Sequence, residues 1–434
     1  MQLDEFIEGF ERDEAAERRR LAAEKSYAIT DHLEDVERQF EQVLQGDTLV
    51  GSTAPEIFVG RSGYPNVSTG LLSPVDTGAA ADDFATSGEW YQQGLGIEDV
   101  LQRRTGMVNS AKPTSVDAVS TGGGRGQSGV HDVWTGFVGV QREVAIADHA
   151  VGVEVGLDGK PDLDVAFDDV STPTGPRARA KRADLTENPH VPRPVEKTLS
   201  DDDWRAEGAM TYLYRRGFDV YDINTILSAG ALGQAHERSL VPTRWSITAV
   251  DDTVGQYLRG TVHNSDTIDK PEVWYNEYMG NRYWILLSPG RWEFELVEMK
   301  APESVWNPRP ETGYYMSSAH EGYEGRTSYV EETAGAYYAA RLGVLEHLSE
   351  RGRQAKVLVV RFASPEYWAP VGVWQIREGV RHAFTESEVG EAESFAAAVR
   401  ELTPHFPVSL ATLRRKSDMV SGLQARLGDF AAGQ

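Results

Sequence analysis

The sequence predicts a mixed α+β fold with a largely antiparallel sheet, packed helices, a long N-terminal helix and a flexible C-terminal peptide. The chain has 434 residues, which is two to three times the length of an average domain. Hydrophobic residues make up 40% and aromatic residues 9% of the chain, so most of it is able to form a core. Segments with a helical period alternate with short β-rich runs, and nothing repeats at a fixed interval.

The first element expected is a helix over residues 3–45, because Glu, Ala, Arg and Leu dominate there and Gly46-Asp47 ends it. We therefore take residues 1–48 as an N-terminal helical segment. Its apolar stripe consists of Leu33, Val36, Phe40, Val43 and Leu44.

Residues 49–240 are predicted to form an N-terminal α+β region with flexible inserts near 110–129 and 172–199. We expect an irregular stretch rich in Gly, Ser, Thr and Pro, a short helix, a Val-rich β block and two further helices. These elements are expected, in that order, at residues 51–74, 97–104, 137–155, 201–218 and 220–232.

Residues 241–410 are predicted to form a C-terminal α+β region with a meander-like antiparallel sheet. Strands are expected at 244–250, 272–279, 282–288, 292–299, 356–362 and 371–377. Helices are expected at 330–351, 391–402 and 410–420. We take residues 411–434 as a C-terminal helix followed by a tail.

The charge is strongly acidic, with 43 Lys and Arg against 67 Asp and Glu, a net charge of −24. This excludes a protein whose whole surface binds nucleic acid, so any DNA contact has to be local. Only nine of the basic residues are lysines. An acidic, Lys-poor surface is typical of a protein that stays soluble in molar salt. The alternative is an ordinary acidic protein from a high-GC genome.

The chain contains no cysteine, which excludes disulfides, a Cys-type zinc finger, a thiol nucleophile and an iron–sulfur cluster. No run of about 18 apolar residues is present, and the N-terminus is acidic without an apolar leader. We therefore expect a cytoplasmic protein that has no membrane partner.

One group of charged residues resembles a metal-dependent nuclease site. Glu298 and Lys300 lie at the end of a predicted strand, Glu295 precedes them, and Asp251 and Asp252 follow another predicted strand. Carboxylates with a lysine at adjacent strand ends suit Mg²⁺-assisted hydrolysis of a phosphodiester. The alternative is a set of solvated charges at the edge of a sheet. Outside this nuclease hypothesis, no cofactor and no metal site is predicted.

Two segments are candidates for contact with DNA phosphates. The glycines of residues 58–70 form either a backbone N–H nest for phosphate, with Arg61 inside it, or a structural turn. A basic cluster lies in the second expected insert, and it consists of Arg177, Arg179, Lys181 and Arg182. The Trp and Tyr residues between 274 and 292 offer either a stacking surface for unpaired bases or a sheet core.

The last residues carry the pattern Q-x-x-L-x-x-F. Gln424, Leu427, Phe430 and Ala431 fall on its positions, with Ala431 where many such peptides have a second aromatic residue. In a single 3₁₀ turn, residues three apart lie on one side, so Leu427 and Phe430 form one apolar plug. The pattern resembles the peptide that docks DNA-processing proteins on the PCNA sliding clamp. The alternative is a last amphipathic helix packed on the protein's own core.

Four blocks of the chain resemble the archaeal Nre DNA-repair family, and in particular its A-type haloarchaeal members. They lie at residues 58–74, 131–148, 240–254 and 282–302, and the likeness covers nearly the whole chain apart from the two inserts. The resemblance implies a role in DNA repair together with PCNA, through residues 424–431. Many relatives carry a Cys-rich zinc element, which this chain does not have.

The sequence therefore predicts a DNA-repair protein that docks on PCNA and contacts DNA through a local surface. A metal-dependent nuclease or phosphodiesterase and a non-catalytic repair adaptor remain as alternatives.

Overall fold

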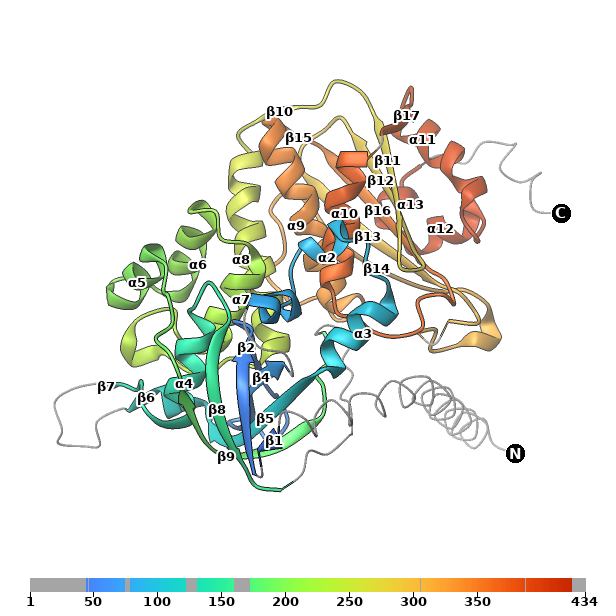
Figure 1. The fold of residues 1–434 in the computed structure, drawn as a ribbon. Coiled ribbons are helices and arrows are strands. Elements are labelled where there is room, and N and C mark those ends of the chain that lie inside the picture. Colours follow the sequence, from blue (N-terminus) through green and yellow to red (C-terminus); the bar gives the residue numbers. More distant parts are fainter. Residues whose placement is uncertain are drawn as a thin grey trace, which may run out of the picture. The chain divides into compact units, whose positions relative to one another are not determined.

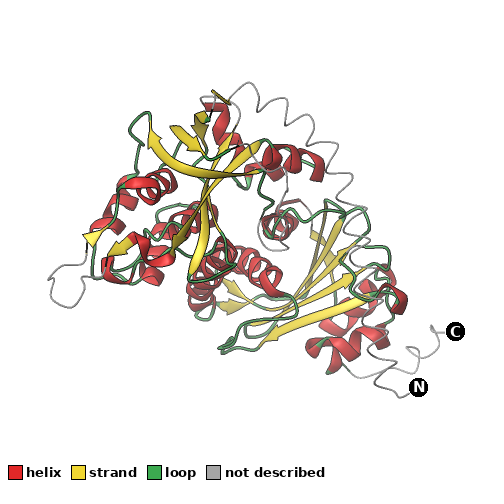
Figure 2. Ribbon diagram, turned by 90° about the horizontal axis from the view of Figure 1, so that it is seen from below, coloured by secondary structure: helices red, strands yellow, loops and turns green. Residues whose placement is uncertain are grey.

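The structure of the chain is a computed structural model that describes residues 44–45, 47–74, 79–121, 131–159, 172–304, 306–386 and 388–423 (Figure 1). The chain divides into two compact units. We call the described residues within Ile29–Val254, together with Pro370–Trp374, the N-proximal unit, and the described residues within Gly255–Ala369 and Gln375–Gln434 the C-proximal unit. Both combine helices with mixed, largely antiparallel sheets, so the predicted α+β class is confirmed (Figure 2).

The strands of the N-proximal unit form a seven-stranded sheet, among the described residues, in the order β1-β2-β8-β9-β5-β4-β3. All neighbours are antiparallel except β5 and β9. One face of the sheet packs on helix α4. The strands are β1 (Leu44–Gln45), β2 (Thr48–Thr53), β3 (Ile57–Val59), β4 (Asn66–Pro74), β5 (Met107–Ser115), β8 (Val151–Leu157) and β9 (Arg177–Leu185), with β6 (Ser120–Thr121) and β7 (His131–Asp132) forming a separate pair.

The N-proximal unit contains several helices in addition to α4. The α-helices are α2 (Glu89–Gln92), α3 (Ile97–Thr105), α4 (Gly136–Ala145), α5 (Arg193–Ser200), α6 (Ala206–Arg215), α7 (Val220–Ser228) and the first part of α8 (Thr243–Val262), and the 3₁₀ helices are η1 (Ala79–Phe84), η2 (Val116–Val119) and η3 (Ala235–Glu237). The unit also takes in Pro370–Trp374, where the Trp374 ring meets the buried Trp90 edge to face, with ring centroids 5.3 Å apart.

The C-proximal unit is built on a six-stranded sheet, among the described residues, in the order β14-β13-β16-β12-β11-β17. β13 and β16 are parallel and the other pairs are antiparallel. The strands are β11 (Glu272–Tyr278), β12 (Asn281–Ser288), β13 (Glu293–Lys300), β14 (Tyr315–Glu321), β16 (Lys356–Ala363) and β17 (Glu388–Glu391), with β10 (Asp266–Thr267) and β15 (Arg353–Gln354) forming a separate pair.

Helices lie on both faces of this sheet. α9 (Ala334–Arg351) and α10 (Trp374–Glu386) cover the face that carries Phe294 and Tyr283. The opposite face forms a second core with the last helices, which are α11 (Phe395–Leu402), α12 (Leu410–Lys416) and α13 (Asp418–Ser421). The 3₁₀ helices η4 (Pro310–Thr312) and η5 (Thr403–His405) lie in the connections.

Several predicted elements are confirmed. The helices expected at 97–104, 201–218 and 220–232 appear as α3, α6 and α7, and those expected at 330–351, 391–402 and 410–420 appear as α9, α11 and α12 with α13. The strands expected at 272–279, 282–288, 292–299 and 356–362 appear as β11, β12, β13 and β16.

The expected helix over 3–45 lies outside the described residues up to position 43, and its last residues form strand β1 instead. The insert expected near 110–129 is strand β5 and helix η2 in its described part. The insert expected near 172–199 contains strand β9 and helix α5. Residues 51–74 are largely strands β2, β3 and β4.

Three β predictions were wrong because tertiary packing overrides the β preference of Val, Ile and Trp. Residues 137–145 form helix α4, whose residues Phe137, Gln141 and Val144 all face the interior. Residues 244–250 belong to helix α8, where Val250, Val254 and Leu258 are buried at intervals of four. Residues 374–377 begin helix α10.

The meander prediction is also wrong in its order. β12 and β13 follow one another in the chain, but β16 lies between them in the sheet. None of the helices in the described ranges has the length and apolar character that a membrane span needs.

Candidate nucleic-acid interface

One part of the N-proximal unit has no acidic residues. Strands β9, β5, β4 and β3 are neighbours in the sheet, and the edge strand β3 is joined to the start of α8 by a 2.9 Å hydrogen bond from the Val59 N–H to Thr243 Oγ1. The segments concerned are residues 57–74, 107–116, 172–183 and 238–250, and none contains Asp or Glu, although the chain has 67 of these residues. We call these four segments the acid-free region. Its basic residues are Arg61, Lys112, Arg177, Arg179, Lys181, Arg182, Arg238 and Arg244.

Strand β9 carries the predicted basic cluster. Its side chains alternate, with Ala178 and Ala180 buried in the core and Arg177 and Arg179 exposed on the other side, as the pleat of a strand requires. The predicted linker is therefore a paired strand that fixes its arginines in a row.

The four basic side chains of this cluster have different surroundings. Lys181 lies 3.1 Å from Asp158, and Arg182 forms ion pairs of 2.5 Å with Glu154 and 2.6 Å with Asp184. In the described part of the chain, no acidic side chain pairs with Arg177 or Arg179. These two arginines therefore carry the positive charge of β9 that is not balanced locally.

Arg61 lies exposed in the turn between β3 and β4. Gly63 has a φ of +80° there, which favours glycine. The Gly60 N–H donates to Ser68 O over 2.7 Å and the Asn66 N–H to Gly63 O over 2.9 Å, so these backbone donors are used within the turn. This geometry favours the structural turn over the phosphate nest, and Arg61 is an exposed side chain of that turn.

Gly70 shows why this sheet needs a small residue in its middle. A Cβ added to Gly70 would lie 2.1 Å from Asn109 Oδ1 on the neighbouring strand β5.

The Arg177 guanidinium lies 5.9 Å from the centre of the Phe58 ring on β3, so it reaches across β5 and β4 on this face. Arg177 and Phe58 thus form a cation–π contact over a floor of small side chains.

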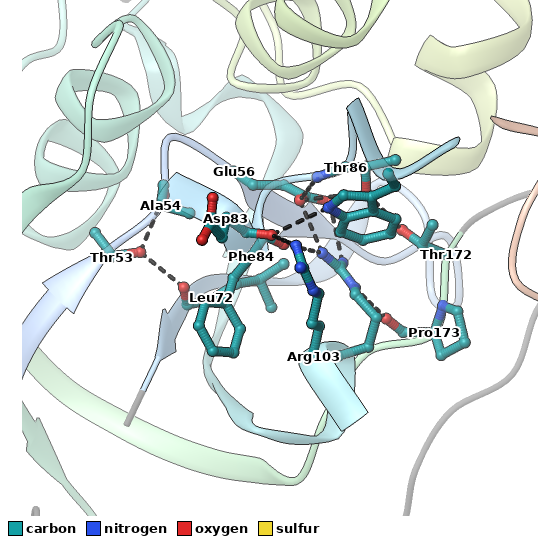
Figure 3. Close-up of polar contacts among 12 residues, drawn as sticks. Thr53, Ala54, Glu56, Leu72, Asp83, Phe84, Thr86, Arg103, Thr172 and Pro173 are labelled. Carbon is teal, nitrogen blue, oxygen red and sulfur yellow. Dashed lines mark hydrogen bonds and ion pairs between the residues drawn. The ribbon is translucent and has the colours of Figure 1, made fainter. Parts of the chain in front are cut away.

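A buried ion pair holds the segments of this region together (Figure 3). Arg104 Nη1 and Nη2 donate to the Glu56 carboxylate over 2.8 and 3.0 Å, and Arg104 Nε donates to Pro173 O over 2.8 Å. The Thr86 N–H also donates to Glu56, over 2.8 Å. Glu56 immediately precedes β3, Arg104 lies just before β5, and Pro173 leads into β9. This bidentate pair therefore fixes the starts of the three strands relative to one another. No pattern in the sequence pointed to it.

Two exposed aromatic residues belong to the acid-free region. Tyr64 in the turn is 53% exposed and Trp245 in the first turn of α8 is 44% exposed, and their ring centroids are 5.2 Å apart with planes inclined by 55°. We call them the Tyr64–Trp245 pair. Neither is singled out by the sequence, where residues 244–250 have the pattern of a strand.

Part of the predicted stacking surface between residues 274 and 292 is a core, whereas Trp274, Tyr275, Tyr278 and Trp284 are half-buried. Tyr283 and Trp292 are fully buried. Trp274 packs edge to face on His347 and Phe384, each with ring centroids 5.5 Å away. Burial also lowers the pKa of His347 to about 4, so this imidazole is neutral at physiological pH.

Glu295, one of the carboxylates of the predicted nuclease site, is bound by the end of the described chain. Its carboxylate accepts hydrogen bonds from Ser417 Oγ at 2.7 Å, the Asp418 N–H at 2.8 Å and the Met419 N–H at 2.9 Å. The last two donors belong to the first turn of α13, where a negative charge is favourable. Burial raises the pKa of Glu295, and these three donors oppose that rise.

Glu298 faces the opposite side of the sheet, since it lies three residues further along β13. Its carboxylate forms a buried ion pair with Arg361 on the adjacent strand β16, and Arg361 Nε also donates to Asn281 Oδ1 over 3.0 Å. Lys300 Nζ lies 5.8 Å from the centre of the Tyr315 ring. Glu295 and Glu298 therefore do not point to a common ion.

Asp251 and Asp252 lie in helix α8, so they do not follow a strand. No group of three or more His, Asp or Glu side chains able to hold a metal occurs among the residues with a described position. Catalysis by the five predicted residues stays a prediction.

The four residues of the predicted clamp peptide, Gln424, Leu427, Phe430 and Ala431, lie outside the described residues. The described chain leading to them ends in α13, whose Val420 is buried in the second core of the C-proximal unit, with Leu423 packed against that core. The segment that precedes the peptide is thus fixed to the folded body.

Comparisons with known proteins place the chain among archaeal proteins. Residues 21–307 match the family described as Archaeal Nre, N-terminal, and residues 321–430 match Archaeal Nre, C-terminal. The chain is 64% identical over 433 residues to the DNA repair protein NreA of Haloferax volcanii, covering 99% of this chain and 100% of the relative.

More distant relatives come from Archaeoglobus fulgidus. Its DNA repair protein NreA is 36% identical over 84% of this chain and 88% of the relative, and its DNA repair protein NreB is 34% identical over 88% and 92%. No solved structure matches the chain.

Proposed function

Because this chain belongs to the archaeal Nre family, we propose that it is a cytoplasmic DNA-repair protein that docks on the PCNA sliding clamp through residues 424–431. The observation that carries the repair role is the 64% identity, over 99% of the chain, to a protein named for DNA repair. The likeness extends over both units, so it is not limited to a single motif.

The docking part of the proposal is supported by the sequence of the tail and by its attachment. Gln424, Leu427 and Phe430 have the spacing that places the two apolar side chains on one side of a 3₁₀ turn. Glu295 and the second core anchor α13 directly before this peptide. An anchored segment followed by a short apolar peptide suits a detachable contact with a partner.

We expect the full-length protein to bind PCNA from the same organism, and Phe430→Ala to weaken this binding at least about tenfold, because the larger apolar side chain of the plug is lost. Isothermal titration or surface plasmon resonance in molar KCl measures the affinity. Arg426→Ala is the matched control, since it changes the same peptide at a position outside the pattern and should bind as the wild type does.

Equal binding by Phe430→Ala and wild type would contradict docking through this peptide, while leaving the repair role intact. The repair role has its own test. Cells that lack the gene should survive ultraviolet and cross-linking damage less well than the parent, and the wild-type gene should restore survival.

The metal-dependent nuclease is a separate hypothesis that no contact in the described part favours, because Glu295 and Glu298 are held by protein donors. Mg²⁺-dependent cleavage of structured DNA by the wild-type protein, abolished in Glu298→Gln with the fold intact, is the result that it requires.

A further inference from the structure

We propose that the Tyr64–Trp245 pair is a stacking platform for an unpaired base of DNA, and that the basic residues of the acid-free region around the pair hold the adjoining phosphates. The proposal rests on the DNA-repair role above and adds to it the surface and the class of DNA.

The first support is the exposure of the two rings. Within the described part of the chain, large apolar side chains with at least a third of their surface exposed are Tyr64, Trp245, Tyr257, Tyr314, Tyr329 and Val389. Tyr64 and Trp245 contact each other, whereas Tyr314 and Tyr329 rest on more buried rings, Phe362 and Tyr338. Because the planes of Tyr64 and Trp245 are inclined by 55°, the two rings do not cover each other's faces. An aromatic face left in water is the surface on which a base stacks.

The second support is the charge around the pair. The protein has a net charge of −24, yet the segments that carry and flank these rings have only basic charges. Arg61 lies three residues before Tyr64, and Arg244 precedes Trp245. A protein partner of ordinary composition has no need of such a gap in the acidic surface, whereas a polyphosphate chain does.

The third support is the path that leads away from the rings. Phe58 lies on β3 just before the turn, and the Arg177 guanidinium is 5.9 Å from the centre of its ring. Arg179 follows two positions along β9, on the same exposed side. The first turn of α8 contains no acidic residue, and the positive end of the α8 helix dipole adds to the attraction for phosphate. Aromatic rings interleaved with arginines are the pattern of a groove for a single strand.

The architecture gives this surface a fixed geometry. The Val59 N–H bond to Thr243 joins the strand before the turn to the helix that bears Trp245, and the Asn66 N–H bond to Gly63 closes the turn that bears Tyr64. The backbone positions from which the two rings project are thus fixed by contacts within two elements, so little backbone ordering is needed on binding.

The test measures DNA affinity of the full-length protein by fluorescence anisotropy in molar KCl. The probes are a labelled single strand of about 20 nucleotides, its perfect duplex, and the same duplex with one extrahelical base. We expect the single strand and the bulged duplex to bind more tightly than the perfect duplex. Trp245→Ala and Tyr64→Ala should each weaken binding of the single strand by about 5- to 100-fold.

Matched variants separate stacking from other causes. Trp245→Phe and Tyr64→Phe keep a ring and should keep most of the affinity. Tyr329→Ala removes a side chain of equal exposure, 54% against 53%, in the C-proximal unit, and should bind as the wild type does. Circular dichroism establishes that each variant is folded, and if Trp245→Ala is not, Tyr64→Ala decides, because Tyr64 lies in an exposed turn.

Wild-type affinity for the single strand in both alanine variants would overturn the proposal, as would equal or tighter binding of the perfect duplex by the wild-type protein. A wild-type protein that binds none of the three probes would overturn it too. None of these results affects PCNA binding through Phe430 or cell survival after damage, so failure here is distinguishable from failure of the proposed function.

Discussion

Three glutamates of the described residues are largely removed from water, and each is held by a different set of donors. Glu56 accepts a bidentate arginine, Glu298 forms an ion pair with Arg361 inside the sheet, and Glu295 accepts backbone N–H groups and a hydroxyl. A carboxylate removed from water has to be matched by such donors, and removal of one member of a buried pair typically costs about 3–5 kcal/mol. In these three cases the acidic side chain therefore stabilises the fold.

A half-buried pair makes the stability of the C-proximal unit depend on pH. Hydrogen bonding to His320, together with Lys356, lowers the pKa of Glu293 to about 2, and the same bond raises the pKa of His320 above its usual value of 6.5. The stabilisation from Glu293 is present above its unfolded pKa of about 4.5 and is lost as pH falls towards 2. The stabilisation from His320 is complete below pH 6.5 and is lost as pH rises through its folded pKa.

We therefore expect His320→Gln to lower the free energy of unfolding by about 1 kcal/mol near pH 6 and by less at pH 8. Denaturant unfolding of wild type and variant at several pH values and constant salt measures this difference. His236→Gln is the control, because His236 is exposed and lies 3.8 Å from an equally exposed Glu237. A difference that does not change with pH would show that the imidazole acts by packing alone.

At the scale of elements, the last two helices depend on one carboxylate of the sheet. Glu295 on β13 accepts the N–H groups that begin α13, and Ser417, the residue between α12 and α13, donates its hydroxyl to the same group. The helix α13 spans only Asp418–Ser421, which is too short to be stable by itself. Its position is therefore set by this contact and by the burial of Val420.

Glu295→Ala should release this end of the chain and lower the free energy of unfolding by about 2 kcal/mol, since three donors lose their acceptor. Hydrogen exchange followed by mass spectrometry should show faster exchange in residues 410–423 and unchanged exchange in β12 and β16. Glu401→Ala, the same substitution at an exposed position of α11, is the control and should exchange as the wild type does. Unchanged protection of residues 410–423 in Glu295→Ala would contradict this role.

The sequence indicated helices well where the apolar period was long, as in α9, and failed where a short window was rich in β-branched residues. In α8 the helical interval of Val250, Val254, Leu258 and Val262 extends beyond the seven residues that have the pattern of a strand. In β9 exposed arginines alternate with the buried residues Ala178 and Ala180. The small side chains of the alanines give a weak hydrophobic signal, so the sequence did not indicate a strand.

The same limits apply to the candidate interface. Arg61, Arg177 and Arg179 are identified from the sequence as basic groups, and their exposure agrees with that. The Tyr64–Trp245 pair could not be predicted from the sequence, because its two residues are 181 positions apart and meet only through the contact of the β3 edge with α8. The absence of acidic residues in four segments is visible in the sequence, but only the order of the strands shows that these segments are neighbours.

For the molecule as a whole, the net charge of −24 sets the conditions in which it is stable. Repulsion between like charges extends over about 10 Å at 0.1 M salt and about 3 Å at 1 M. We therefore expect the melting temperature to rise between about 0.1 and 2 M KCl, as scanning fluorimetry can measure. A protein of similar length with a net charge near zero, melted alongside, is the control, and an equal rise in both proteins would contradict an origin in this chain's charge.

The contact between Trp90 and Trp374 has a consequence for the order in which the protein is made. The N-proximal unit receives Trp374 from a stretch of chain 120 residues beyond Val254. At about 5–20 residues per second, a ribosome needs about 6–24 s to add that length. During that interval the indole of Trp90 lacks its aromatic neighbour, so the nascent chain has an unfilled apolar site that a chaperone can bind. A protein fragment that ends at Val254 would lack Trp374 altogether and would keep this site unfilled.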